Sequence, residues 1–285
     1  MRRALPFFFI VLCWVAVGCG KKDASVPRRN KYYRKVISLS PSTTEIVSSD
    51  GDVQTLRGRT AADNFPQNVV AGIRIVAAVK PDYETIAAIH PDLIVYDKSL
   101  YTAQDIEKLK APGTDFFAID AETVDSFIKE LYELGAMLGW ETRFNDYINR
   151  IQMEKEGVAK YSPVPKVAII IPSADGSDMI CGADGFLGDV VKIAGGQIVG
   201  PKGTLFVPLN PEALVALNPD VILASGTKAD LSGIVALQKD PRFKTISAVK
   251  NNRVMGIDAD VLLRRGQRVD QLLKSVHLEI GPPSQ

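Results

Sequence analysis

The sequence predicts an α/β fold made of two lobes. Short apolar runs alternate with helical patterns along the chain, which is typical of a largely parallel sheet covered by helices. One segment of the first half, residues 84–95, recurs in the second half as residues 212–223. The chain has 285 residues, of which 46% are hydrophobic, so it can bury a core in each lobe.

Composition excludes several classes of protein. The chain has 34 basic and 33 acidic residues, so its formal net charge is +1 and no overall field favours a nucleic acid partner. The hydrophobic content also excludes a disordered chain and a small disulfide-stapled protein. We expect no nucleic acid partner and no cofactor.

The first element is a leader at residues 1–18. Arg2 and Arg3 precede an apolar run that ends at Val17, which is shorter than the about 20 residues that span a bilayer. This pattern predicts a signal peptide. The run ends in Ala-Val-Gly-Cys, which resembles a bacterial lipobox and implies a lipid on Cys19. The alternative is an ordinary secretory signal that is cleaved near Gly18.

Residues 19–35 come next. They are polar and basic, and they predict a tether between the lipidated cysteine and a globular body. After removal of the leader, Cys181 is the only cysteine left for the folded part. We therefore expect no internal disulfide and a buried thiol.

The N-terminal lobe is expected over residues 36–140. It opens with an apolar strand at 36–39, which Ser40 and Pro41 end. Ser42 and Glu45 have the spacing of a capping box, so they predict the start of a helix. Further strands are expected at 73–76, 93–96 and 116–119, with helices at 83–89, 102–109 and 123–138.

A connecting helix is expected over residues 141–161. Gly139 and Trp140 interrupt the preceding helix, and an amphipathic pattern then runs from Thr142 to about Lys160. Nineteen residues of helix measure about 28 Å, enough to pass from one lobe to another.

The C-terminal lobe is expected over residues 162–281. Apolar strands are predicted at 166–171, 221–224 and 254–257, and helices at 186–193 and 267–280. The repeated segment reads ETIAAIHPDLIV in the first lobe and EALVALNPDVIL in the second. In both copies a short helix ends before Pro-Asp and a strand follows, because proline cannot continue the helix.

These segments together resemble the periplasmic binding proteins that serve ABC importers of iron–siderophores, heme and vitamin B12. The resemblance covers residues 36–280, and its markers are 36–45, 83–94, 211–222, 248–254 and 265–268. It implies two Rossmann-like α/β lobes, joined by a single long α-helix, with the ligand in the cleft between them. It also implies a monomeric, extracytoplasmic lipoprotein, anchored in the membrane through Cys19, that delivers a metal chelate to an ABC permease dimer.

Glu84 and Glu212 hold the same place in the repeated segments, each in the first turn of a short helix. The helical period turns Glu84 away from the apolar side of its helix, so it should face water. An acid in a first turn also complements the helix dipole, and this alone explains either residue. The resemblance implies a further role, in which the two glutamates dock onto arginines of the two permease subunits.

The ligand is expected to touch loops at the strand ends that face the cleft. The candidate residues are Ser40, Ser42, Thr43, Asn64, Phe65, Tyr96, Lys98, Tyr101, Met179, Phe206, Asp258 and Arg264. Heme would use Tyr96 or Tyr101 as its iron ligand. Ferric carboxylate siderophores would use a basic cleft, for which Arg57, Arg59, Lys98, Arg264 and Arg265 are available. Cobalamin receptors favour aromatic clefts, and Trp140 lies away from the cleft loops.

Two other functions compete with chelate capture. The first is a receptor of similar architecture for a bare metal ion or an oxyanion, but only His90 and His277 are available as histidine ligands. The second is an α/β enzyme, but the sequence has no Walker A motif, no nucleophile elbow and no dinucleotide-binding fingerprint. The sequence therefore predicts a binding protein and no catalytic residue.

Overall fold

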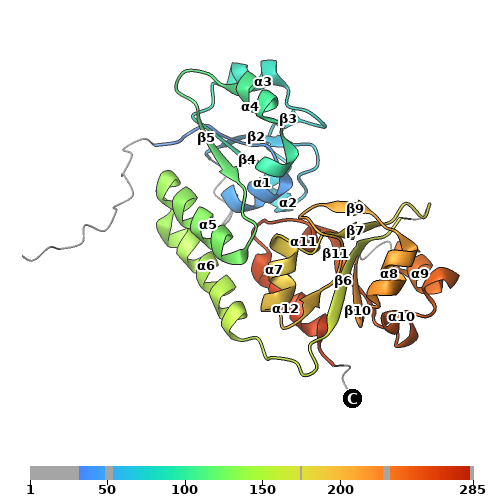
Figure 1. Cartoon of the computed structure of the whole chain (residues 1–285). Coiled ribbons are helices and arrows are strands. Elements are labelled where there is room, and N and C mark those ends of the chain that lie inside the picture. The colour runs from blue at the N-terminus through green and yellow to red at the C-terminus, as the bar shows by residue number, and fades with distance from the viewer. Residues whose placement is uncertain (1–31, 49–53, 174, 227–231, 283–285) are drawn as a thin grey trace, which may run out of the picture. The chain divides into compact units, whose positions relative to one another are not determined.

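The computed structural model describes residues 32–48, 54–173, 175–226 and 232–282. The leader, Cys19 and most of the tether lie outside these ranges. Figure 1 shows two α/β lobes with two helices, α5 and α6, beside them. This confirms the predicted fold class of two α/β lobes.

The N-terminal lobe contains a five-stranded parallel sheet with the order β3-β2-β1-β4-β5. Its first helix begins one residue after Ser40, whose hydroxyl accepts a hydrogen bond from the Thr43 amide at 3.1 Å. The predicted capping box of Ser42 and Glu45 is therefore wrong. Pro41 takes the first helical position, which needs no amide hydrogen, and this moves the cap to Ser40. The strands are β1 (Val36–Ser38), β2 (Leu56–Thr60), β3 (Ile75–Ala77), β4 (Leu93–Asp97) and β5 (Asp115–Ile119), and the helices are α1 (Pro41–Val47), α2 (Gln67–Val70), α3 (Tyr83–Ile89) and α4 (Ala103–Leu109), with the 3₁₀ turn η2 (Lys98–Leu100).

Two helices connect the sheets. α5 (Val124–Leu138) ends at Gly139, which adopts a left-handed conformation with φ 71°, and α6 (Glu141–Glu156) packs against it. The break predicted at Gly139 and Trp140 is confirmed. The connecting helix ends at Glu156, before the expected Lys160, where Gly157 follows as its cap.

The C-terminal lobe has a mixed sheet with the order β11-β10-β6-β7-β9, and β8 pairs with β6. β7 is antiparallel to both of its neighbours, and the apolar periodicity gave no sign of this pairing. The helices α7 and α12 cover one face of the sheet and α8, α9 and α10 cover the other (Figure 1). The strands are β6 (Lys166–Ile171), β7 (Met179–Cys181), β8 (Gln197–Ile198), β9 (Phe206–Pro208), β10 (Val221–Gly226) and β11 (Val254–Asp258), and the helices are α7 (Phe186–Ile193), α8 (Pro211–Leu217), α9 (Ser232–Lys239), α10 (Ser247–Lys250), α11 (Ala259–Leu262) and α12 (Val269–Ile280), with the 3₁₀ turn η3 (Pro241–Phe243).

One hydrophobic core extends through both lobes. It contains Val36 and Leu93 from the first sheet, and Val167 and Val221 from the second. Apolar residues of α5 and α6, such as Leu131, join the two sides. Each sheet has a further, separate cluster on its other face, because successive side chains of a strand point to opposite faces.

The repeated segments fold in the same way. α3 and α8 are both capped at their start by a side chain, and both end in a left-handed residue, His90 with φ 51° and Asn218 with φ 43°. In each copy the aspartate that follows the proline binds the backbone at the start of the neighbouring strand, Asp92 at Lys35 and Asp220 at Lys166. The repeat is thus one helix–turn–strand unit used once in each lobe.

Candidate functional site

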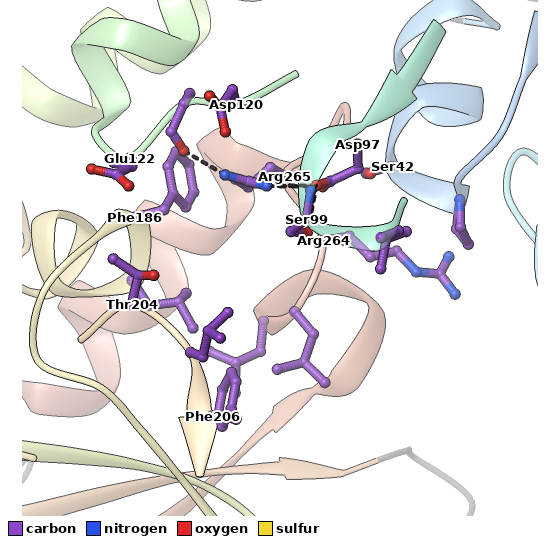
Figure 2. Close-up of a pocket in the computed structure, with 17 residues that line it drawn as sticks. Ser42, Asp97, Ser99, Asp120, Glu122, Phe186, Thr204, Phe206, Arg264 and Arg265 are labelled. Carbon is purple, nitrogen blue, oxygen red and sulfur yellow. Dashed lines mark hydrogen bonds and ion pairs between the residues drawn. The ribbon is translucent and has the colours of Figure 1, made fainter. Parts of the chain in front are cut away.

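A pocket of about 390 Å³ opens between the two lobes, at the carboxyl ends of β4 and β5. Ligands of open α/β sheets bind at this edge. Figure 2 shows side chains from both lobes pointing toward the same space. The pocket is lined by Pro41, Ser42, Asp97, Ser99 and Leu100 of the N-terminal lobe, Asp120, Ala121 and Glu122 of the turn after β5, and Phe186, Leu187, Thr204, Leu205, Phe206, Leu262, Leu263, Arg264 and Arg265 of the C-terminal lobe.

Much of this lining is apolar. Leu100 is 59% exposed, Leu205 is 68% exposed and Leu263 is 40% exposed, although each is a large hydrophobic side chain. Phe186 and Phe206 lie beside them in the same wall. Large apolar side chains that gather around one opening indicate a site for an apolar surface.

Most charged residues of the pocket are paired with other charged groups of the protein. Both carboxylate oxygens of Asp97 accept hydrogen bonds from Nη2 of Arg265, at 2.8 and 2.9 Å, and Arg265 also donates to the Ala121 carbonyl (Figure 2). Asp120 pairs with Lys98 at the rim. Arg264 donates to Asn64 at 2.6 Å and pairs with Asp260 at 2.6 Å. Few of these charges are left for a ligand to neutralise.

Three of the predicted ligand contacts line the pocket, namely Ser42, Phe206 and Arg264. Ser40 and Thr43 lie just beneath, but both are fully buried and their hydroxyls bond to each other at 2.7 Å. They shape the first turn of α1 and present no atom to the pocket.

The two tyrosines proposed for heme iron lie outside the pocket lining. Tyr96 and Tyr101 pack edge to face, with ring centroids 6.4 Å apart, over the outer cluster of the N-terminal lobe. The Tyr101 hydroxyl donates to the Leu39 carbonyl, and burial raises the pKa of Tyr101 to about 12. A phenolate is therefore costly to form at this position near neutral pH.

The other predicted contacts have structural partners. Asn64 donates to Asp260 at 2.7 Å, and the guanidinium of Arg268 lies 4.6 Å from the centre of the Phe65 ring. Asp258 caps α11, and Met179 pairs with Pro208 between β7 and β9. Lys98 does not line the pocket, but it forms an ion pair with Asp120, which does. Arg59, offered as a basic group for an anionic ligand, instead donates to the carbonyls of Val70 and Thr60.

Several lining residues escaped the sequence analysis. Asp97 ends β4 and Asp120 follows β5, so the rule that ligands meet the carboxyl ends of parallel strands was sufficient to find both. Phe186, Leu187 and Thr204 carry no comparable signal, because they come from the start of α7 and from a loop that only tertiary packing brings to the pocket.

The remaining predicted residues lie on the surface or in the core. Glu84 and Glu212 are exposed in the first turns of α3 and α8, and the expectation that Glu84 faces water is confirmed. Cys181 is buried, as expected, and burial raises the pKa of its thiol to about 12. Within the described ranges, no three His, Cys, Asp or Glu side chains come together in a way that would hold a metal ion. No helix in the described part of the chain is both long enough and apolar enough to cross a membrane.

Comparison with known proteins gives a consistent result. The model of a family described as periplasmic binding protein matches residues 36–261. An uncharacterized ABC transporter substrate-binding lipoprotein of Bacillus subtilis is 26% identical over 269 residues, which cover 90% of this chain and 83% of that protein. The high-affinity heme uptake system protein IsdE of Staphylococcus aureus is 25% identical over 194 residues, 63% of this chain and 64% of that protein.

Solved structures show the same fold. The heme-binding protein BhuT in complex with two hemes superposes with a TM-score of 0.73 at 20% identity, covering 88% of this chain and 98% of that one. The vitamin B12 binding protein BtuF of Vibrio cholerae superposes with a TM-score of 0.69 at 18% identity, covering 87% and 96%. Because the family model matches residues 36–261, which make up the N-terminal lobe and most of the C-terminal lobe, the chain belongs to the periplasmic binding protein family and is a substrate-binding protein of an ABC importer, not an enzyme.

Proposed function

We propose that this protein captures a metal chelate whose metal is already fully coordinated, such as a corrinoid or an iron–siderophore without excess negative charge. The observation that carries the proposal is the lining of the pocket. Among the described residues that line it, none is a tyrosine, histidine, methionine or cysteine, so the lining offers no usual ligand for heme iron.

The charged residues of the pocket narrow the class of ligand further. Asp97, Asp120 and Glu122 contribute three carboxylates, against the two guanidinium groups of Arg264 and Arg265. A polyanionic ferric carboxylate would meet this acidic excess without a free basic partner. The leucines and phenylalanines, in contrast, offer an apolar surface to the face of a macrocycle or the body of a chelate.

Binding to purified full-length protein in detergent tests the proposal. Cyanocobalamin, ferric hydroxamate siderophores, ferric citrate and hemin would be titrated by calorimetry and absorbance. We expect a corrinoid or a hydroxamate to bind at micromolar affinity or better, with no change in metal coordination. A hemin spectrum with a new protein ligand to iron would instead identify a heme receptor.

A pair of variants locates the binding surface. Leu205→Glu places a charge in the apolar wall and should weaken binding at least about tenfold, because the ligand would then desolvate a carboxylate. Leu278 is 66% exposed on α12, outside the pocket lining, so Leu278→Glu is a matched control for Leu205, which is 68% exposed. Equal affinity in both variants would place the ligand elsewhere.

We also propose that Glu84 and Glu212 dock the protein onto the permease dimer. The helices α3 and α8 each lead through a short turn into a parallel strand, so each helix runs opposite to its strand. Their first turns therefore lie at the carboxyl edge of each sheet, which for β4 is the edge that opens on the pocket. An exposed carboxylate at this edge of each lobe would let charge guide the encounter with the permease.

Charge reversal tests the docking proposal. Glu84→Arg combined with Glu212→Arg should abolish uptake while the affinity for ligand in solution stays unchanged. Glu133→Arg with Glu156→Arg makes the same change of charge on α5 and α6 and should leave uptake intact. Normal uptake by the first double variant would refute the docking role.

A lipid anchor at Cys19 would hold this receptor at the membrane, with residues 1–18 as its leader and residues 19–35 as its tether. The proposal rests on the lipobox-like Ala-Val-Gly-Cys sequence and on the description of the Bacillus subtilis relative as a lipoprotein. Two or more acyl chains make membrane attachment stable. Cys19→Ala should move the protein into the soluble fraction, and unchanged membrane association in this variant would contradict the anchor.

A further inference from the structure

The five-residue segment Arg264–Arg268, between α11 and α12, belongs to the C-terminal lobe but binds the N-terminal lobe. All three of its arginines reach across, and each contacts a different set of groups. Two of them, Arg264 and Arg265, also line the pocket. The segment therefore forms part of the pocket wall and part of the contact between the lobes.

Glu45 of α1 is the innermost partner. Its side chain has no exposed surface, and Oε1 accepts a hydrogen bond from Nη2 of Arg268 at 2.6 Å while Oε2 accepts one from Nε at 3.1 Å. Arg264 adds a contact to Oε1 at 3.3 Å. A guanidinium that binds both oxygens of a carboxylate fixes orientation as well as distance.

Gly266 lets the backbone of the segment lie close to Glu45 of α1. A Cβ atom at this position would lie 2.5 Å from Oε2 of Glu45, so any side chain here would have to displace the Glu45 carboxylate. The Gly266 carbonyl accepts a hydrogen bond from Tyr147 of α6 at 2.6 Å. The segment is thus held on one side by Glu45 and on the other by the connecting helix.

The outer contacts lie along the pocket. Arg265 binds both oxygens of Asp97 at the end of β4, as described above, and Asp97 is only 7% exposed. Asn64, in the loop after β2, binds Arg264 and Asp260 at once. The segment therefore reaches the N-terminal lobe at α1, at the loop after β2 and at the end of β4.

We propose that Arg264, Arg265 and Arg268 are positioning residues that form an interlobe lock, which sets the separation of the two pocket walls before any ligand arrives. Breaking a buried ion pair leaves a charge without a partner in a poorly solvated place, so the lobes cannot separate at this segment without a large cost. The ligand then meets a preformed site and does not have to order two independent walls.

The lock can be tested without a ligand, so its failure would not be confused with a failure of the proposed function. Spin labels would be placed at two exposed sites, Gln104→Cys on α4 and Ala216→Cys on α8. The full-length protein would carry Cys13→Ala and Cys19→Ala, and Cys181 stays unlabelled because it is buried. Pulsed electron paramagnetic resonance then gives the distribution of distances between the lobes.

The main variant is Asp97→Asn with Arg265→Gln, which removes both charges together and leaves no buried charge unpaired. We expect a distance distribution about twofold broader than that of the unmodified lock, because the lobes sample more orientations. Arg268→Lys keeps the charge but loses the two-point contact, and it should give an intermediate width.

The control is Asp240→Asn with Arg242→Gln, a pair two residues apart within the C-terminal lobe, with a hydrogen bond of 2.6 Å. It should leave the distribution narrow. Circular dichroism would confirm that each variant is folded. If the main variant and Arg268→Lys both gave distance distributions as narrow as the wild type, the lock would be overturned. The shared core and the helices α5 and α6 would then be what restrains the separation of the lobes. Broadening in the control as well would also overturn it.

Discussion

Arg265 and Asp97 come from opposite lobes and lie 168 positions apart in the chain, yet one guanidinium nitrogen binds both carboxylate oxygens in the pocket lining. The sequence identified Arg264 and Arg265 as basic groups available to an anionic ligand. The structure places both guanidinium groups against carboxylates of the protein itself. Which residues form ion pairs over such a separation depends on how the lobes pack, and no local sequence pattern encodes that packing. The charge that the pocket leaves available to a ligand could therefore not be predicted from its residues.

Glu130 of α5 offers a test at the scale of single residues. Burial raises its pKa, Oε1 accepts a hydrogen bond from the Asp120 amide at 3.0 Å, and Oε2 is buried without a partner. Because the pKa in the folded state lies above that of the unfolded chain, this group favours folding below the unfolded pKa, and that contribution is lost as the pH rises through the folded pKa.

Glu130→Gln keeps the acceptor oxygen and removes the charge. We expect the variant to gain melting temperature relative to the wild type as the pH rises from about 4 to 7, the range over which a carboxylate of raised pKa ionises. Thermal melts at a series of pH values would measure this difference. A constant difference across the series would show that the Glu130 carboxyl titrates normally.

At the scale of elements, the repeated helix–turn–strand unit was the most predictable part of the chain. Its periodicity, its proline and its recurrence gave α3, α8, β4 and β10 within about a residue or two. The antiparallel strands β7 and β9 were not found, because they are three residues each and too short to show a period. The start of α1 was misplaced because the spacing of Ser42 and Glu45 fits a capping box, whereas Ser40, which the sequence assigned to the end of the strand, is the cap.

The two copies of this unit differ in one measurable way. Asp92 accepts hydrogen bonds from two backbone amides, those of Arg34 and Lys35, whereas Asp220 accepts one, from Lys166. Hydrogen bonds to a charged group contribute about 1.5–3 kcal/mol where they are shielded and less at an exposed site. Asp92→Ala should therefore lower the free energy of unfolding by about 1–2 kcal/mol, and Asp220→Ala by less. Urea unfolding of the two variants would compare them, and a larger loss for Asp220→Ala would contradict this explanation.

At the scale of the whole molecule, the two lobes share a core. Val36, Leu131 and Val221 belong to a single cluster of buried residues, although they come from the first sheet, the connecting helices and the second sheet. The sequence predicted two lobes from the repeat. It could not show that one hydrophobic cluster passes from one lobe into the other, since the residues involved are the same aliphatic types that fill any core.

A shared core predicts that the lobes unfold together. Fluorescence of Trp140, in the break between α5 and α6, and far-ultraviolet circular dichroism should follow the same denaturant curve, with one midpoint. Two separated transitions would mean that each lobe is stable alone. The lock variant Asp97→Asn with Arg265→Gln should keep the single transition at a lower midpoint, because the core remains intact.

The exposed glutamates on α3 and α8 sit on lobes whose spacing the arginine segment holds constant. An empty receptor and a loaded one would then present nearly the same face to the permease, and empty copies would act as competitive inhibitors of loaded ones. Uptake would follow the loaded fraction of the receptor and not its total amount. A cell that overproduced this protein when ligand is scarce would therefore take up ligand more slowly. The permease would have to recognise the ligand in the open pocket, because the conformation of the binding protein would hardly change.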